Sequence, residues 1–288
     1  MSLNDNAVFT AAKGYVFTAP VGTAAPTPAE IAEFEPETFG GANHELKVTG
    51  NPTGGTFTIT YDTATTEALP YNATSGAVQS ALEKLAKVGP GNVVVTGETL
   101  VEGLTIAFIG DLRTSDKAPT ATADFTGGST PKIVVSKGLE GNAWDPIGHT
   151  AEEDLPEFGY EGGDKESKGT WQKKNLKEVT TEAVVDYVTL KLNQFDLKTF
   201  SYYYGKNKST TPGVFGVDSG DNASVEEAIL IVIVDGDYRI GFTAAKSSIR
   251  RDESISLATD DFSQLPIRST FVKHPGRLLF EWIVPSEV

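Results

Sequence analysis

Three histidines and a few carboxylate-rich or glycine-rich stretches are the parts of this chain that could do chemistry. His44, His149 and His274 have no metal spacing such as H-x-x-x-H, and none lies beside a serine or aspartate in a recognisable nucleophile motif. The chain has no cysteine, which excludes disulfides, thiolate nucleophiles and cysteine metal sites. We therefore interpret the histidines as structural or exposed residues.

Glu152, Glu153 and Asp154 form an acidic run that could offer paired carboxylates for glycoside hydrolysis. That chemistry needs two carboxyl groups facing each other across a substrate, and closeness in the sequence does not provide this geometry. A run of like charges is more commonly a solvated surface. The run is interpreted as surface, and the sequence predicts no catalytic residue, metal or cofactor.

Two further stretches have the composition of ligand-binding loops but lack the residue spacing of the known motifs. Residues 161–169 are rich in glycine but have no G-x-x-x-x-G-K-[ST] pattern and carry too many acids to cradle phosphate. Residues 218–222, with Glu226 and Glu227, resemble a calcium loop without its D-x-[DN]-x-[DN]-G order. Oxygen-rich residues are common in turns for conformational reasons, so both stretches are interpreted as loops.

Charge excludes one class of function. The net charge is −15, from 24 basic and 39 acidic residues, so binding of nucleic acid by phosphate neutralisation is not expected.

The longest aliphatic run, residues 228–234, is far shorter than the ~20 residues of a membrane-spanning helix. The N-terminal residues show no basic region followed by an apolar stretch, so no signal peptide is expected.

Hydrophobic periodicity predicts a mainly β chain with a minor helical part. Apolar side chains alternate in 57–61, 104–108, 184–192 and 278–284, which is typical of half-buried antiparallel strands. Three short helices are predicted: 28–34 with Thr27 as cap, 75–86 with Asn72 or Ser75 as cap, and 196–204.

Composition divides the chain into a core and an insert. It changes near Gly40 and again near Gly141, and the stretch between is rich in Thr, Gly, Ala and Val. That stretch is close to balanced in charge, so most of the surplus acids lie in the flanking sequence. We predict a core domain of residues 1–40 and 142–288 and an inserted, outward-facing α+β domain of residues 41–141.

The flanking sequence carries an ordered set of motifs. Residues 12–27 read AKGYVFTAPVGTAAPT and lead into the first predicted helix. WDPIGHTA follows at 144–151, then an acidic segment, then FGYEGGDKESKGTWQ at 158–172. This order resembles the major tail tube proteins of long-tailed, siphovirus-type actinobacteriophages, above all those of mycobacteriophages. Within the insert, GGTFTITYD, LPYNATSGAVQSALEKL and GPGNVVVTG resemble a small module of other phage structural proteins.

The resemblance implies a fold and a function. The core would be a tail-tube β-sandwich with a flanking helix, whose inner strands join those of other copies into a hexameric ring barrel. Stacked rings would form the tail tube that conducts DNA into the host. The resemblance implies further copies of the chain, a tape measure protein and a tail terminator as partners, with genomic DNA passing without specific binding. The protein would reside in the virion tail and be assembled in the host bacterial cytoplasm, with no membrane contact.

Two structural roles follow from this resemblance. Residues 159–183 are charged and poor in apolar side chains, which suits an arm that orders against a neighbouring ring. The predicted arm residues are Glu161, Asp164, Lys165, Glu166, Lys168 and Trp171. A negative lumen would repel DNA phosphates, and Asp186, which interrupts the apolar alternation of 184–192, is the predicted lumen-facing acid.

Two other classes of function stay open at this point. A carbohydrate-binding or adhesin-like β module on a virion or cell surface would show exposed aromatic residues near acids, and Tyr202–Tyr204 is the candidate cluster. A tail glycosidase would use the carboxylates of the acidic run at Glu152–Asp154.

Overall fold

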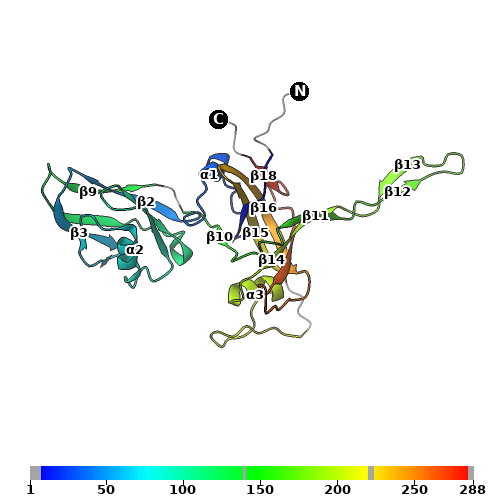
Figure 1. Ribbon diagram of the computed structural model, residues 1–288. Helices are drawn as coiled ribbons and strands as arrows, with labels where there is room; N and C mark the ends of the chain where they lie inside the picture. Colours follow the sequence, from blue (N-terminus) through cyan, green and yellow to red (C-terminus); the bar gives the residue numbers. More distant parts are fainter. Residues whose placement is uncertain (1–7, 139–140, 220–223, 285–288) are drawn as a thin grey trace, which may run out of the picture. The chain divides into compact units, whose positions relative to one another are not determined.

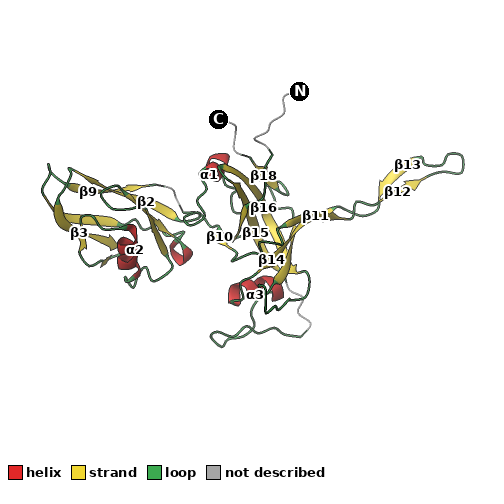
Figure 2. Ribbon diagram, viewed as in Figure 1, coloured by secondary structure: helices red, strands yellow, loops and turns green. Residues whose placement is uncertain are grey.

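The computed structural model describes residues 8–138, 141–219 and 224–284, and within them the chain is mainly β (Figures 1 and 2). Three α-helices and one short 3-10 helix, Gly110–Leu112, accompany the strands in these ranges. The prediction of a mainly β chain with a minor helical part is confirmed. No helix among the described residues is long and apolar enough to cross a membrane.

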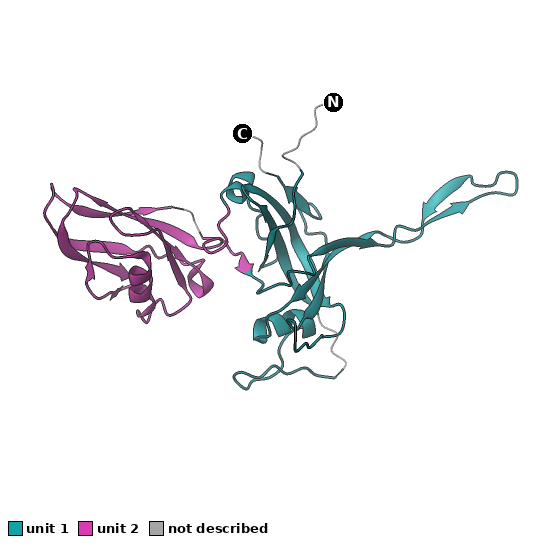
Figure 3. Cartoon of the chain, in the orientation of Figure 1, with its two compact units in different colours: residues 1–33, 146–288 teal, residues 34–145 magenta. Residues whose placement is uncertain are grey.

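The chain forms two compact units, drawn in different colours in Figure 3. Unit 1 consists of Met1–Glu33 and Pro146–Val288, and unit 2 of Phe34–Asp145. Unit 2 extends beyond 41–141 at both ends because its flanking residues pack within it. The Phe34 ring lies 5.0 Å from that of Phe39, and Asp145 accepts a 2.7 Å hydrogen bond from Arg113.

Unit 1 is built on one antiparallel sheet. The strands run in the order β10-β1-β15-β16-β17-β14-β11, and β18 also pairs with β16. Their bounds are β1 (Lys13–Ala19), β10 (Asp145–Pro146), β11 (Glu157–Glu161), β14 (Val185–Leu192), β15 (Val225–Asp235), β16 (Tyr238–Arg251), β17 (Leu265–Phe271) and β18 (Glu281–Ile283). The C-terminal strand is shorter than predicted because only residues 281–283 pair with β16.

The inner face of this sheet carries the core of unit 1. Val188, Leu190 and Leu192 alternate along β14 and are buried, as the periodicity predicted. The sheet curls, since Phe158 of β11 lies 4.6 Å from Phe242 of β16 although two strands separate β11 from β16 in the sheet. The curl brings apolar side chains of distant strands into contact: Phe242 is buried, and Phe158 covers it from the surface.

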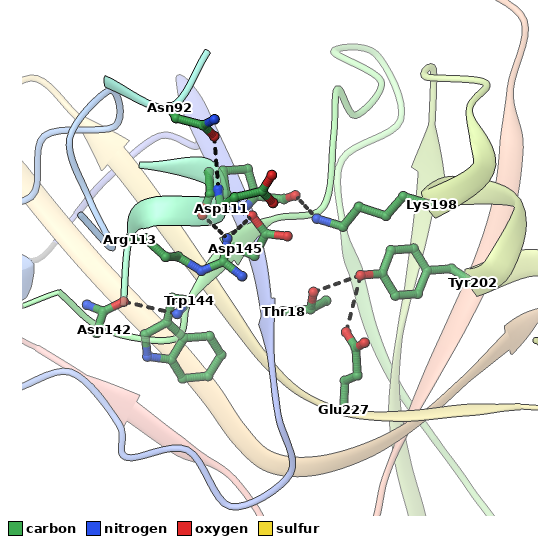
Figure 4. A network of polar contacts seen from close by, with 12 residues as sticks. Thr18, Asn92, Asp111, Arg113, Asn142, Trp144, Asp145, Lys198, Tyr202 and Glu227 are labelled. Carbon is green, nitrogen blue, oxygen red and sulfur yellow. Dashed lines mark hydrogen bonds and ion pairs between the residues drawn. The ribbon is translucent and has the colours of Figure 1, made fainter. Parts of the chain in front are cut away.

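Helix α3 (Leu197–Tyr204) packs on the same core and is capped by the Asp196 side chain, as an N-cap aspartate caps a helix by accepting backbone hydrogen bonds. Its Tyr202 hydroxyl bonds to Thr18 at 2.8 Å and to Glu227 at 3.2 Å (Figure 4). Tyr203 donates to the Glu253 carbonyl at 2.6 Å. These bonds satisfy the polar ends of two rings that are otherwise buried.

Part of the outer face is covered by helix α1 (Pro28–Ala32). Thr27 caps this helix in a capping box with Glu30, which confirms the predicted cap. A side chain at Gly241 of β16 would meet Ile31 at 3.1 Å, so the missing Cβ lets the helix approach the sheet. Phe17 and Leu230, paired across β1 and β15, are buried on this side.

Unit 2 holds two four-stranded antiparallel sheets and one helix. The first sheet has the order β6-β7-β2-β9, and the second centres on β3 with β4, β5 and β8. The bounds are β2 (Ala42–Thr49), β3 (Gly54–Tyr61), β4 (Ala64–Thr65), β5 (Leu69–Pro70), β6 (Val93–Thr96), β7 (Leu104–Phe108), β8 (Thr120–Thr126) and β9 (Lys132–Lys137).

Helix α2 (Ser75–Glu83) packs its apolar side on the strands of unit 2. Val78 and Leu82 are fully buried in a cluster with Phe57 and Ile106, as the helical spacing predicted. The cap is Thr74, whose hydroxyl accepts from the Ala77 backbone at 3.3 Å, so the prediction of Asn72 or Ser75 was wrong by a residue or more.

We expect unit 2 to fold by itself, because its apolar cluster is made of its own residues. The excised fragment 34–145 should unfold in one cooperative thermal transition, and Leu82→Ala should lower its free energy of unfolding by about 2–5 kcal/mol. Val101→Ala, at an exposed position, is the control and should change it little. A fragment without a cooperative transition would show that unit 2 depends on the rest of the chain.

Candidate assembly surfaces

A hairpin arm continues β11 and β14 beyond the sheet of unit 1 (Figure 1). It consists of β12 (Lys165–Lys168) and β13 (Lys177–Thr180), paired antiparallel. Every residue of β12 is exposed, as is every residue of β13 except the half-buried Val179. The arm therefore contributes almost nothing to the apolar core of its own unit.

The structure places most of the predicted arm residues in this hairpin. Lys165, Glu166 and Lys168 lie in β12, and Asp164 precedes it and accepts from the Thr181 backbone at 2.8 Å. Exposed ion pairs join Lys165 to Glu178 and Lys168 to Glu166, at 3.8 and 3.5 Å. Such surface pairs add little stability, so the hairpin is held mainly by its few backbone bonds.

Trp171 lies in the turn between the two arm strands, and its side chain is fully exposed. A fully exposed Trp costs hydration free energy that burial would recover, about 1.5–3 kcal/mol for a large apolar side chain. Trp is also among the residues that dominate the energetics of protein interfaces. Its position at the tip suits contact with another molecule.

The sixth predicted arm residue, Glu161, lies at the root of the arm and has an intrachain partner. Its Oε1 accepts a 2.7 Å hydrogen bond from Arg268 of β17. The guanidinium carbon of Arg268 lies 3.5 Å from the centroid of the Tyr187 ring in β14. A Cβ at Gly159 would come within 2.6 Å of that ring, so a glycine is needed opposite Tyr187.

Sequence reasoning missed Arg268, Tyr187 and Gly159. Arg268 and Glu161 are 107 residues apart, and no local pattern connects them. Only the register of β11 on β14 and of β14 on β17 brings the three positions together. A glycine within a strand is the one local signal, since it marks a close approach of another group.

Ion pairing shifts the pKa values at this part of the sheet. The hydrogen bond from Arg268 holds the pKa of Glu161 below its ordinary 4.5. Hydrogen bonds from Lys191 and Gln264 likewise hold the pKa of Asp154 below 3.8. Both carboxylates favour the folded state while ionised, so their contribution is present above the ordinary carboxyl pKa and is lost as the pH falls below it.

The part of the outer sheet face away from α1 is polar, and we call it the charged sheet face. Strand register places its side chains on one side of β11, β14, β15, β16 and β17. Its polar members are Glu157, Glu161, Tyr187, Thr189, Lys191, Glu226, Ser248, Arg250, Arg268 and Thr270, and the same register adds the apolar Val185 and Pro266. Asp154, beside β11, reaches this face by an ion pair with Lys191 at 2.8 Å.

Asp186, the predicted lumen-facing acid, lies on the opposite side of β14. It is half-buried and stands across from Tyr160 of β11. Alternation puts it on the side of Val188 and Leu190, near the end of the strand where the core gives way to the arm. Its orientation in an assembly stays a prediction.

The remaining candidate residues form no recognisable catalytic arrangement among the described residues. His44 is buried in unit 2. His149, Glu152 and Glu153 line a hollow of about 520 Å³, yet both carboxylates are exposed. His274 lies against Gly22. The calcium-like stretch lies partly outside the described residues, at 220–222.

The aromatic cluster that would serve carbohydrate binding is not an exposed platform. Tyr202 and Tyr203 are 3% and 6% exposed, and Tyr204 is half-buried. Their rings belong to the core of unit 1 or pack against it. The packing of α3 therefore explains this cluster, and no structural observation favours a carbohydrate site there.

Comparisons with known proteins agree with one another. A family model described as "Phage tail tube protein" matches residues 1–69 and 98–287. Two curated relatives, each named "Major tail protein Gp23", come from Mycobacterium phages D29 and L5. They are 53% and 52% identical over 140 residues, which make up 49% of this chain and 70% of theirs.

A solved structure from Mycobacterium phage Patience is also similar, at 16% identity over 39% of this chain and 51% of that one. Its TM-score of 0.27 does not establish a shared fold. The stretch that the family model leaves out, residues 70–97, contains α2 and β6 of unit 2.

The ion pair at the arm root can be tested by titration. Arg268→Met should raise the pKa of the Glu161 carboxyl toward its ordinary value, measured by NMR of side-chain carboxyl carbons. Lys191→Met is the matched control: it should raise the pKa of Asp154 and leave that of Glu161 unchanged. Equal Glu161 pKa values in wild type and Arg268→Met would contradict the pairing.

Proposed function

We propose that this chain, which belongs to the phage tail tube protein family, polymerises as stacked hexameric rings into the tube that conducts DNA into the host. It is a structural protein of the phage tail and not an enzyme. The observation that supports self-assembly best is the arm, a solvent-exposed hairpin with a fully exposed Trp171 at its tip.

The arm is built as a segment that needs a partner. An isolated two-stranded hairpin is marginally stable in water, and here each strand has four residues. Its charged side chains and single apolar anchor suit docking on a polar protein surface. We propose that the arm docks on a subunit of the neighbouring ring.

A free sheet edge supports ring formation. β11 ends the sheet of unit 1 and, among the described residues, pairs with β14 on one side alone. Its other edge presents backbone groups that can pair with a strand of another copy. Head-to-tail contacts that close around an axis make a ring, and an arm directed along the axis stacks the rings.

The acidity of the core supports a negative lumen. Most of the surplus acids lie outside the predicted insert, and phosphates are repelled by a surface of like charge. Asp186 was the lumen-facing residue predicted from the sequence. Because it lies opposite the charged sheet face, only one of these two sides of β14 can face the DNA.

The remaining parts of the proposal follow from the family. We propose that a tape measure protein and a tail terminator contact the assembled tube, and that assembly takes place in the host cytoplasm. Unit 2, the structural counterpart of the predicted insert, is proposed to face outward, since an inserted domain on the lumen side would narrow the conduit.

Self-assembly is testable on the purified chain. Concentrated wild-type protein should form rings or tubes in negative-stain electron microscopy. Replacement of residues 164–181 by two glycines should leave a β-rich monomer, judged by circular dichroism, that forms no tubes. Wild-type protein that stays monomeric at all salt concentrations would contradict the proposed function.

The arm tip can be tested alone. Trp171→Ala should raise the protein concentration needed for tubes by about tenfold or more, because an interface Trp commonly contributes 2 kcal/mol or more. Val101→Ala, another exposed apolar truncation, is the control and should assemble like wild type. Tubes of Trp171→Ala at the wild-type concentration would place the tip outside the stacking contact.

A further inference from the structure

On the charged sheet face some cations are covered by carboxylates, while Arg250 is exposed. Three basic residues on or beside this face have an acidic partner within 2.9 Å: Arg268 with Glu161, Lys191 with Asp154, and Lys246 of β16 with Glu226. Arg268, Lys191 and Lys246 have side chains that are 12%, 33% and 23% exposed, whereas their partners are 58%, 39% and 54% exposed. In each pair the carboxylate is the more exposed member.

The three acids come from separate segments and arrive at one surface. Asp154 precedes β11, Glu161 ends β11, and Glu226 lies in β15. Arg250, a further cation on this face, also lies near Glu161, since its charge helps to lower the pKa of that carboxyl. Asp252 and Glu253, which follow the exposed Arg251 in the chain, add negative charge close to Arg268 and Lys191.

Cations that are covered by carboxylates cannot bind a polyanion such as DNA. Proteins hold DNA by Lys and Arg contacts to phosphate, and each contact releases counterions and adds affinity. A cation covered by its own carboxylate offers no such contact, while the exposed carboxylate repels phosphate. Screening limits this repulsion to about 8 Å at physiological ionic strength, so the surface next to the polyanion decides whether it is held.

We propose that the charged sheet face is turned toward DNA and is non-adhesive because Asp154, Glu161 and Glu226 shield Lys191, Arg268 and Lys246. This orientation turns Asp186, on the opposite side of β14, away from the DNA, in place of the lumen position predicted for it from the sequence. The proposal rests on the proposed function, in which DNA moves through the tube. The three carboxylates are then the residues that keep the lumen wall from binding the genome.

The test neutralises the three carboxylates and leaves their partner cations in place. The variant Asp154→Asn, Glu161→Gln, Glu226→Gln is compared with wild type as unassembled protein, using fluorescence anisotropy of a labelled double-stranded DNA. Wild type should not bind. The variant should bind at least about tenfold more tightly at low salt, with affinity falling as salt rises, by a log–log slope of roughly −2 to −3 for three freed cations.

A matched control separates shielding from net charge. Glu67→Gln, Glu98→Gln and Asp237→Asn neutralise three exposed acids elsewhere, and this variant should remain non-binding. Adding Lys191→Gln, Lys246→Gln and Arg268→Gln to the test variant should abolish its binding. Circular dichroism checks the fold of each variant, and Glu226→Gln alone is used if the triple variant unfolds.

Equal DNA binding by the test and control variants would overturn the proposal, as would tight binding by wild type. Tube formation by wild type is scored separately in the microscope. Tube formation together with equal DNA binding by the test and control variants would refute the proposed shielding of the cations and leave the proposed function intact. Absence of tubes would refute the proposed function, whatever the DNA result.

Discussion

Burial of one apolar sheet face is the constraint on which the rest of unit 1 depends. The sheet curls until Phe158 meets Phe242, and α3 adds Tyr202 and Tyr203 to the same core. The inner face is satisfied in this way and part of the outer face is covered by α1, so the remaining parts of the sheet have no core-building role. The free edge of β11, the hairpin arm and the charged sheet face are left as surfaces through which the chain can meet other molecules.

Much of this fold could be predicted from the sequence, because its signals are local. Alternation marks β14, a Thr-Pro pair marks the start of α1, and a charged stretch poor in apolar residues marks the arm. The ends of elements were less predictable: Thr74, and not Asn72 or Ser75, caps α2 because cap choice depends on the exact entry of the chain into the helix.

The arrangement of the charged residues could not be predicted from the sequence. Glu161 and Arg268 are separated by 107 residues, and their pairing depends on two strand registers and on Gly159 admitting the Tyr187 ring. Net charge alone indicates that the chain is acidic, not where its acids lie. The structure shows that Glu161 and Glu226 are more exposed than Arg268 and Lys246, the cations with which they pair. In our proposal this difference in exposure decides how the surface meets a phosphate backbone.

Assembly and charge are therefore linked through the arm root, where Glu161 both ends the strand that leads into the arm and covers Arg268. The measurement that tests this account most directly is a cryo-electron microscopy reconstruction of tubes grown from the purified chain. The account predicts hexameric rings in which the arm crosses to the next ring and Asp154, Glu161 and Glu226 line the lumen. A tube with the charged sheet face turned outward, or buried against another subunit, would contradict it.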